Sequence, residues 1–338
     1  MVLDVLQEKL LPLIEAELKQ FISNLDFGVS EEMKQMITYH LGWVIKQGDS
    51  GSRGKRIRPF LTLLCAGAFN TDVIKALPGA VSLELLHNFT LIHDDIEDDS
   101  LLRHGRPTLW KQWGTAQAIN AGDALFSIAQ LSMLSLSKTC DKSIALTAAK
   151  HLNQICLQLT RGQYLDISFE STKTIATATY LEMIEGKTAA LIALSTALGS
   201  LIANQNQSIQ NELSEFGKSL GLAFQIQDDY LGVWGDPEVT GKSAASDLLN
   251  RKKTLPVLFG LTECAEFRQL WAQDTLSPAD VERMSILLET CGAQEFVRSK
   301  AEHFTTQAYQ ILENVFPVRN NYATALFELT EKLLNRQA

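Results

Sequence analysis

The chain has 338 residues, 46% of them hydrophobic, and a formal net charge of −9. This acidic balance excludes the basic surface that nucleic-acid binding normally needs. No apolar run is long enough to span a bilayer, and the acidic, amphipathic segment 1–21 is unlike a signal peptide. The five cysteines lie scattered in apolar stretches without metal-ligand spacing, as in proteins of reducing compartments. We therefore expect a cytoplasmic protein with no transmembrane segment and no nucleic-acid partner.

Helical periodicity dominates the chain. Apolar residues recur at three- and four-residue steps through 5–18, 61–69, 81–92 and 121–136. Three later segments, 142–171, 176–203 and 208–233, are apolar around much of their circumference, which is typical of buried central helices. Breaks are expected at 48–51, 70–72, 103–107, 204–208 and 235–237. The sequence predicts an all-α fold with a single domain spanning 1–338.

Two aspartate pairs directly follow apolar stretches: Asp94-Asp95, with Asp98 one turn later, and Asp228-Asp229. Carboxylates crowded at the end of a helix are unfavourable unless a cation lies between them, because the helix C-terminus carries partial negative charge. Oxygen-only ligands suit Mg²⁺, which usually completes its shell with water and substrate phosphates. Either cluster alone could be a solvated helix end. Together they indicate a metal site with a phosphate-bearing ligand.

Three cations, Lys55, Arg56 and Arg58, stand at the entrance of a helix whose first turn holds Pro59. Cations at a helix N-terminus oppose the macrodipole, just as acids do at the C-terminus. Alone, this segment could be a solvated basic turn. Beside two carboxylate clusters it indicates an anion site, in which cations and backbone N–H groups bind a metal-bound diphosphate.

In this order and spacing, the motifs resemble those of the trans-isoprenyl diphosphate synthases, also called polyprenyl synthetases. The resemblance covers nearly the whole chain and rests on segments 54–59, 94–98 with Arg103, 162–166, 186–188, 224–229, 240–242 and 247–256. It implies an antiparallel helical bundle of the isoprenoid synthase type around a deep central cavity, usually as a homodimer. It also implies condensation of isopentenyl diphosphate with an allylic diphosphate, assisted by three Mg²⁺ ions.

The resemblance also assigns roles to single residues. The metal ligands would be Asp94, Asp98 and Asp228, with Asp95 and Asp229 in support. The allylic diphosphate would be held by Arg103, Lys187, Lys242 and Lys252. Isopentenyl diphosphate would be held by Lys55, Arg58 and His87, and polar atoms of Thr188 and Gln225 would face the developing allylic cation.

The reaction itself requires metal ions, cationic side chains and an apolar cavity. Cleavage of a carbon–oxygen bond to release diphosphate creates a carbocation and a highly charged leaving group. Catalysis must therefore stabilise the anion and keep water from the cation. Metal ions and lysines meet the first need, and an apolar shaft meets the second. The carbon–carbon bond forms because the second substrate is held in line with the cation. No side-chain nucleophile is required.

Two positions depart from the family pattern. His104 stands where a second arginine usually contacts isopentenyl diphosphate, and Gly232 stands where the second motif usually closes with an aspartate. Because a histidine is only partly charged near neutrality, we expect weaker binding of isopentenyl diphosphate above about pH 7, unless His104 is held protonated. Arg106 is the neighbouring cation that could compensate.

Product length should depend on the residues before the first aspartate pair. Phe89 lies five residues before Asp94, about 7–8 Å down a helix, and is followed by Thr90. In the resembled family a bulky residue there floors the cavity, although an ordinary core phenylalanine fits the sequence equally well. The pattern is similar to geranylgeranyl diphosphate synthases. We expect a C20 main product, with C15 next.

Two other functions are compatible with part of the pattern. A class I terpene cyclase shares the fold and the ionisation chemistry but would be expected to lack Lys55, Arg58 and a second aspartate pair. A non-catalytic subunit of a heteromeric synthase would be expected to lose motif aspartates. Since the chain retains Asp94, Asp98 and Asp228, an active prenyltransferase is the favoured interpretation.

Overall fold

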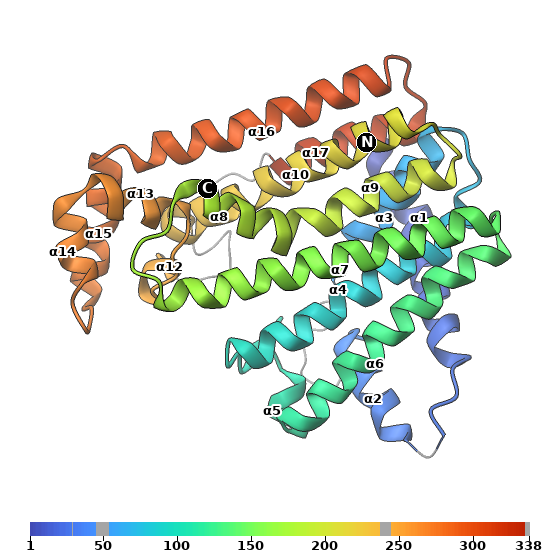
Figure 1. The fold of residues 1–338 in the computed structure, drawn as a ribbon, viewed down its shortest axis with the longest axis horizontal. Coiled ribbons are helices and arrows are strands. Elements are labelled where there is room, and N and C mark those ends of the chain that lie inside the picture. The colour runs from blue at the N-terminus through green and yellow to red at the C-terminus, as the bar shows by residue number, and fades with distance from the viewer. Residues whose placement is uncertain (29, 45–53, 237–244, 335–338) are drawn as a thin grey trace. The chain divides into compact units, whose positions relative to one another are not determined.

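The computed structural model describes residues 1–28, 30–44, 54–236 and 245–334, most of them helical (Figure 1). The helices before residue 140 are α1 (Val2–Ser23), α2 (Glu31–His40), α3 (Ile57–Ala68), η1 (Val73–Ala76), α4 (Leu77–Glu97), α5 (Leu109–Trp113), α6 (Thr115–Leu134) and η2 (Ser135–Lys138). They are followed by α7 (Lys142–Ser171), α8 (Thr177–Ile184), the π-helical η3 (Glu185–Ala189), α9 (Ala190–Ile202) and α10 (Gln207–Trp234). The last are α12 (Ser246–Leu249), α13 (Leu255–Glu263), α14 (Ala265–Trp271), α15 (Pro278–Thr290), α16 (Ala293–Val315) and α17 (Asn321–Leu334).

The all-α prediction is confirmed. Helix α7 has the predicted bounds, and α10 extends one residue beyond each end of the predicted 208–233. A two-residue hairpin, β1 (Leu102–Arg103) with β2 (Arg106–Pro107), occupies the expected break at 103–107. The expected break at 48–51 lies outside the described residues. None of the described helices combines the length and the apolar composition that crossing a lipid bilayer requires.

The prediction of one helix over 176–203 is confirmed in extent, because α8, η3 and α9 follow one another without a break from Thr177 to Ile202, but the π-helical turn η3 inside it was not predicted. At this turn the backbone contacts α7 closely. A Cβ atom on Gly186 would lie 2.7 Å from the Gln158 carbonyl oxygen, and one on Gly162 would lie 2.7 Å from the carbonyl carbon of Gly186. Apolar periodicity cannot reveal such a turn, since one extra residue barely changes the pattern. Single π turns inside helices are frequent at functional sites.

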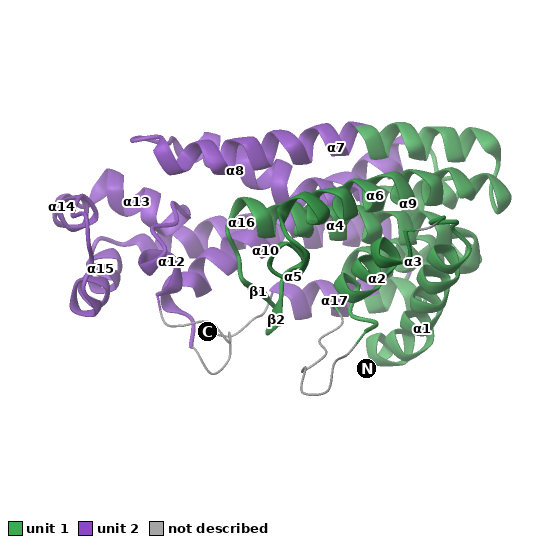
Figure 2. Cartoon of the chain, turned by 90° about the horizontal axis from the view of Figure 1, so that it is seen from below, with its two compact units in different colours: residues 1–153, 195–206, 319–325 green, residues 154–194, 207–318, 326–338 purple. Residues whose placement is uncertain are grey.

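The chain divides into two compact units, which Figure 2 colours separately. Unit 1 comprises residues 1–153, 195–206 and 319–325, and unit 2 comprises residues 154–194, 207–318 and 326–338. Three helices, α7, α9 and α17, contribute residues to both units. The single domain expected from the sequence stays a prediction.

Helix α4 forms the centre of unit 1. It packs against α1, α3 and α6, and the ten residues from Leu77 to Leu86 are all buried. Enclosure on every side explains why this stretch is apolar around its whole circumference. The polar Glu84 in its middle is the exception, with 3% of its surface exposed. A buried carboxylate of this kind must be paired.

Helix α10 forms the centre of unit 2, as α4 does in unit 1. Figure 1 shows α16 running along it, and α8, η3, α12 and α13 also contact it. Its buried side chains include Phe216, Leu220 and Ile226. The two central helices therefore share one design, and each carries one of the aspartate pairs.

The positions of the two pairs within their helices differ. Asp94 and Asp95 lie in the last turn of α4, as predicted. The expectation that Asp228 and Asp229 also end a helix is wrong, because α10 continues to Trp234. The residues after the pair are still mostly apolar, and Val233 is buried. Continuing the helix therefore adds packing of apolar side chains, which stabilises it.

Candidate active site

The first aspartate pair lies on α4 with one carboxylate turned toward solvent and one buried. The backbone N–H of Asp98 donates to the Asp94 carbonyl at 2.9 Å, so these two residues are one helical turn apart. Asp94 is partly exposed and Asp98 is exposed. Asp99 then adopts a left-handed conformation, with φ of 48°, which ends the helix. The two acids therefore share the open end of α4.

Asp95, by contrast, is 2% exposed and bound by Arg103. The Arg103 Nε atom donates to both carboxylate oxygens, at 2.9 and 3.0 Å, and Nη2 lies 2.8 Å from Oδ1. Burial raises the pKa of the Asp95 carboxyl, and Arg103 offsets part of that rise. Asp95 is thus committed to holding the following hairpin in place.

The hairpin presents Arg103 and His104. His104 and Gly105 form its two-residue turn with φ values of 52° and 75°, a primed turn that suits right-handed strand twist. His104 is exposed, and its pKa lies below the usual 6.5 because of partial burial and the Arg103 charge, although Asp95 acts in the opposite sense. The loss of its charge therefore occurs at a lower pH than the sequence suggested.

Arg106, the cation that could compensate for His104, lies in an enclosed position, and its role toward substrate stays a prediction. Its side chain is buried, its guanidinium lies 4.0 Å from the centre of the Tyr39 ring, and Nη2 donates to the Val44 carbonyl at 2.9 Å. These contacts fix the hairpin to the segment after α2.

The basic residues of unit 1 surround two neutral histidines. Lys55 is exposed, whereas the Arg58 Nε atom is enclosed and has no hydrogen-bond partner among the described residues. Burial, followed by the charges of Arg58 and Arg103, holds the pKa of His87 well below 6.5. Burial and the Arg103 charge likewise lower the pKa of His40 to about 3. No role for His40 was predicted from the sequence, and only the structure shows that it lies close enough to these arginines to feel their charge.

The predicted site residues of unit 2 form an ion pair and a separate chain of hydrogen bonds. Lys187 lies in η3 and its ammonium contacts the Asp166 carboxylate at 2.5 Å. The Thr188 hydroxyl donates to Gln225 Oε1 at 2.9 Å, and Gln225 Nε2 donates to Asp229 Oδ1 at 3.1 Å. The π turn therefore places Lys187 and Thr188 beside different partners, one acidic and one neutral.

Asp229 ends this chain of hydrogen bonds and is 2% exposed. It accepts hydrogen bonds from the Tyr180 hydroxyl and, at 3.3 Å, from the Leu255 backbone N–H. Burial raises its pKa to about 7, against the opposing effects of the hydrogen bonds from Tyr180 and Gln225. Asp229 joins α8, α10 and the start of α13.

Both aspartate pairs therefore divide their tasks in the same way. The second member, Asp95 or Asp229, is buried and hydrogen-bonded within the protein, while the first member, Asp94 or Asp228, is partly exposed. Among the described residues, no three His, Cys, Asp or Glu side chains gather closely enough to hold a metal ion by themselves. Mg²⁺ commonly takes only one or two carboxylates and completes its shell with water and phosphate. The exposed carboxylates fit that ion.

Asp247 begins one of the segments that carry the family resemblance, but no role was predicted for it. It belongs to α12, and its carboxylate fills the space that a side chain at Gly232 would need. Its charge also acts on Asp229. The glycine that departs from the family pattern thus allows another carboxylate to approach α10.

The remaining predicted residues have mixed outcomes. Lys252 is exposed, and its backbone N–H donates to the Asp247 carbonyl at 2.9 Å. Lys242 lies outside the described residues. Of the other predicted diphosphate and metal residues, those between Lys55 and His104 belong to unit 1 and those between Lys187 and Lys252 belong to unit 2.

The predicted chain-length residues lie on α4 in unit 1. The Phe89 ring packs against Phe126 of α6 at 5.2 Å and against His93 at 4.8 Å, measured between ring centres. The Thr90 hydroxyl donates to the His87 carbonyl at 2.8 Å. Phe89 is therefore held in one orientation by a second aromatic ring.

Replacement of Gly232 by alanine should destabilise the protein, although alanine usually stabilises a helix by about 1 kcal/mol relative to glycine. The added methyl group would overlap the Asp247 carboxylate. We expect a net loss of about 1–3 kcal/mol in the free energy of unfolding, as is typical of overpacking. Urea unfolding measures it, with the exposed Asn211→Ala in α10 as control. A stability equal to or above that of the wild type would contradict this account.

Comparison with known proteins agrees with these features. Residues 47–288 match the polyprenyl synthetase family. The chain is 38% identical over 336 residues to a (2E,6E)-farnesyl diphosphate synthase of Mycobacterium tuberculosis, covering 96% of this chain and 91% of that protein. It is 39% identical over 311 residues to a geranylgeranyl diphosphate synthase of the same species, covering 89% of this chain and 87% of that protein.

Comparison of the fold with solved structures also finds prenyl diphosphate synthases. The crystal structure of a geranylgeranyl pyrophosphate synthetase from Pyrococcus horikoshii superposes with a TM-score of 0.87 at 28% identity, covering 99% of this chain and 98% of that one. The fold is therefore that of the isoprenoid synthases. With more than half of its length matched and relatives above 30% identity along nearly all of it, the chain belongs to the polyprenyl synthetase family.

Proposed function

We propose that this protein is a Mg²⁺-dependent short-chain trans-prenyltransferase that condenses isopentenyl diphosphate with an allylic diphosphate. The observation that carries the proposal is the shared design of the two central helices. Each bears an aspartate pair in which the second carboxylate is locked by hydrogen bonds and the first is partly exposed. Relatives named farnesyl and geranylgeranyl diphosphate synthase support this reaction class.

Asp94, Asp98 and Asp228 would hold the Mg²⁺ ions, three of them when a diphosphate is bound. Their all-oxygen donor set suits a hard cation. Bound Mg²⁺ would neutralise the charge that develops on the departing diphosphate. Asp95 and Asp229 support these ligands as positioning residues, because Arg103 and Tyr180 already occupy their oxygens.

The protein's own cations complete the diphosphate sites. Arg103, Lys187 and Lys252, together with Lys242, bind the allylic diphosphate, and Lys55, Arg58 and His87, with His104, bind isopentenyl diphosphate. The enclosed Arg58 Nε atom supports the second assignment, since a buried donor without a partner is costly until an acceptor arrives. The low pKa of His87 means that it contributes a neutral imidazole N–H to the site.

The oxygens of Thr188 and Gln225 would face the allylic cation as it develops. Their mutual hydrogen bond, and the one from Gln225 to Asp229, hold these oxygens in one arrangement before substrate binds. Such preorganised dipoles stabilise charge without the cost of reorienting during the reaction. The apolar side chains of the cavity would keep water from the cation.

Geranylgeranyl diphosphate is the main product that we propose, with farnesyl diphosphate next. We also propose a homodimer and a cytoplasmic location. Exposed apolar side chains on α6 and α7 support the homodimer, since a second copy could cover them: Leu131, Leu134, Leu146, Leu157 and Tyr164. All five cysteines are free thiols, as is usual in reducing compartments.

A condensation assay tests the proposed function. Purified protein is incubated with labelled isopentenyl diphosphate and a C5, C10 or C15 allylic diphosphate, and the extracted products are separated by chain length. We expect prenyl diphosphates up to C20, abolished by EDTA and restored by Mg²⁺. Cyclic hydrocarbons, or no product without a second protein, would contradict the proposal in favour of a cyclase or a non-catalytic subunit.

Replacement of Phe89 by alanine should lengthen the product. Removing the ring would leave Phe126 and His93 without their aromatic partner and open space beside α4. We expect the main product to grow by at least one C5 unit, measured by chromatography of the dephosphorylated alcohols. Phe304→Ala, in unit 2, is the matched control and should leave the product length unchanged. An unchanged product in Phe89→Ala would place the floor elsewhere.

The pH dependence of isopentenyl diphosphate binding should reflect the low pKa of His104. Because that pKa lies below 6.5, the imidazolium charge is lost at a lower pH than that of an ordinary histidine. The ratio of the Michaelis constants of His104→Gln and wild type should be constant from about pH 7 to 8 and rise below about pH 6. A ratio that falls between pH 7 and 8 would show that His104 is still charged there.

A further inference from the structure

Arg56 adopts a backbone conformation that is unusual for its residue type. It is the N-cap of α3, with φ of 49° and ψ of 38°, in the left-handed region. This conformation is unfavourable for residues with a Cβ atom, because the Cβ lies too close to the following carbonyl oxygen. Such strain persists only where surrounding contacts determine it. The conformation matters because Arg56 lies between Lys55 and Arg58, and so sets the direction in which the chain enters the helix.

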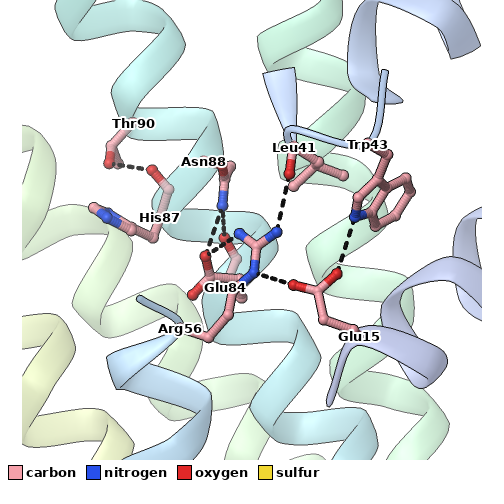
Figure 3. A network of polar contacts seen from close by, with 8 residues as sticks. All are labelled: Glu15, Leu41, Trp43, Arg56, Glu84, His87, Asn88 and Thr90. Carbon is pink, nitrogen blue, oxygen red and sulfur yellow. Dashed lines mark hydrogen bonds and ion pairs between the residues drawn. The ribbon is translucent and has the colours of Figure 1, made fainter. Parts of the chain in front are cut away.

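The contacts that hold Arg56 are three directed hydrogen bonds, shown in Figure 3. Its Nε atom donates to Glu15 Oε1 at 2.6 Å, Nη1 to Glu84 Oε1 at 2.7 Å, and Nη2 to the Leu41 carbonyl at 3.0 Å. The side chains of Arg56 and Glu84 are each 4% exposed. Burial alone would lower the pKa of Arg56, but the carboxylates of Glu84 and Glu15 raise it above its usual value. The guanidinium is thus a fixed charge in an enclosed site.

The acceptors of Arg56 are themselves held in place. Glu15 Oε2 accepts a hydrogen bond from Trp43 Nε1 at 3.0 Å. Asn88 Nδ2 donates to the Glu84 carbonyl at 2.7 Å and to Glu84 Oε1 at 3.1 Å. Figure 3 shows this network gathering α1, the segment after α2, the start of α3 and α4 around one guanidinium.

The network lies next to the substrate groups of unit 1 without including them. Asn88 directly follows His87 on α4, and the charge of Glu84 acts on Arg58. Lys55 precedes Arg56 and is exposed. The three bonds of Arg56 therefore connect the helix that carries His87 to the helix entrance that carries Lys55 and Arg58.

We propose that Arg56 is a positioning residue that directs Lys55 and Arg58 toward isopentenyl diphosphate through its bonds to Glu15, Glu84 and Leu41. The inference rests on the proposed function and adds to it a residue that does not touch substrate. Only a planar fork with several donors reaches three separate acceptors. Arginine is required at this position for its geometry as well as its charge.

Arg56→Lys is the decisive variant, since it keeps the positive charge beside the buried carboxylate of Glu84 and the partly buried carboxylate of Glu15. Lysine cannot reach all three acceptors, so the entrance of α3 should lose its fixed direction. We expect the Michaelis constant for isopentenyl diphosphate to rise about ten- to hundredfold. The turnover number at saturation should stay within about threefold, and the Michaelis constant for the allylic substrate within about twofold. Glu15→Gln, which weakens one of the three bonds, should change the same constant in the same direction by less.

Arg283→Lys is the matched control, because its partner Glu266 and Arg283 itself form an exposed ion pair. It should leave both Michaelis constants unchanged. Thermal unfolding of every variant separates positioning from stability. A purely structural role would lower the active fraction and the turnover number while leaving both Michaelis constants as they are. That result, or an equal rise for both substrates, would overturn the inference.

Calorimetric titration of isopentenyl diphosphate into each variant, without allylic substrate, measures binding without turnover. A dissociation constant that rises in Arg56→Lys and not in Arg283→Lys supports the inference, even for a preparation that forms no product. Equal dissociation constants in wild type and Arg56→Lys would overturn it. Turnover by the wild type alone decides the proposed function, so the two failures are distinguishable.

Discussion

A carboxylate next to a second carboxylate in a protein interior is stable only when donors surround it. Both central helices meet this constraint in the same way. Arg103 binds both oxygens of Asp95, and Tyr180, Gln225 and the Leu255 N–H bind Asp229. The locked carboxylates fix the ends of neighbouring elements. The first members of the pairs, Asp94 and Asp228, are partly exposed, and we propose them as ligands of Mg²⁺.

The three cations at the start of α3 show the same contrast between one enclosed residue and its more accessible neighbours. Arg56 is enclosed and bound to two carboxylates, while Lys55 beside it is exposed and Arg58 Nε has no partner among the described residues. Within each charged motif one member is enclosed and hydrogen-bonded within the protein, and the members that we propose as ligand-binding are its neighbours. This division explains why adjacent residues of one type are not interchangeable.

Much of this could be predicted from the sequence. The periodicity over 142–171 and 208–233 gave α7 and α10 almost to the residue, because long apolar helices leave an unambiguous pattern. Motif spacing predicts that Asp94, Asp98 and Asp228 are metal ligands, and this stays a prediction. What spacing could not reveal was which member of each pair is buried, since that depends on Arg103 and Tyr180, which are placed by tertiary packing.

Other features had no sequence signal. The π turn at Glu185–Ala189 depends on the close contact of Gly162 with Gly186, two motif glycines whose proximity no local pattern encodes. The approach of Asp247 to Gly232 is likewise a long-range contact. The expectation for His104 rested on the ordinary histidine pKa, which partial burial and the charge of Arg103 lower in the structure.

The most direct test of the account compares turnover by Asp94→Asn, Asp228→Asn and the double variant, under saturating Mg²⁺ and both substrates. If the two exposed carboxylates serve one reaction, each single variant should lose about 10²–10³-fold in turnover number. The double variant should lie within about tenfold of either single one, because residues that act as a unit are not additive. Wild-type turnover in Asp228→Asn, or losses that multiply in the double variant, would contradict the claim that both central helices act together.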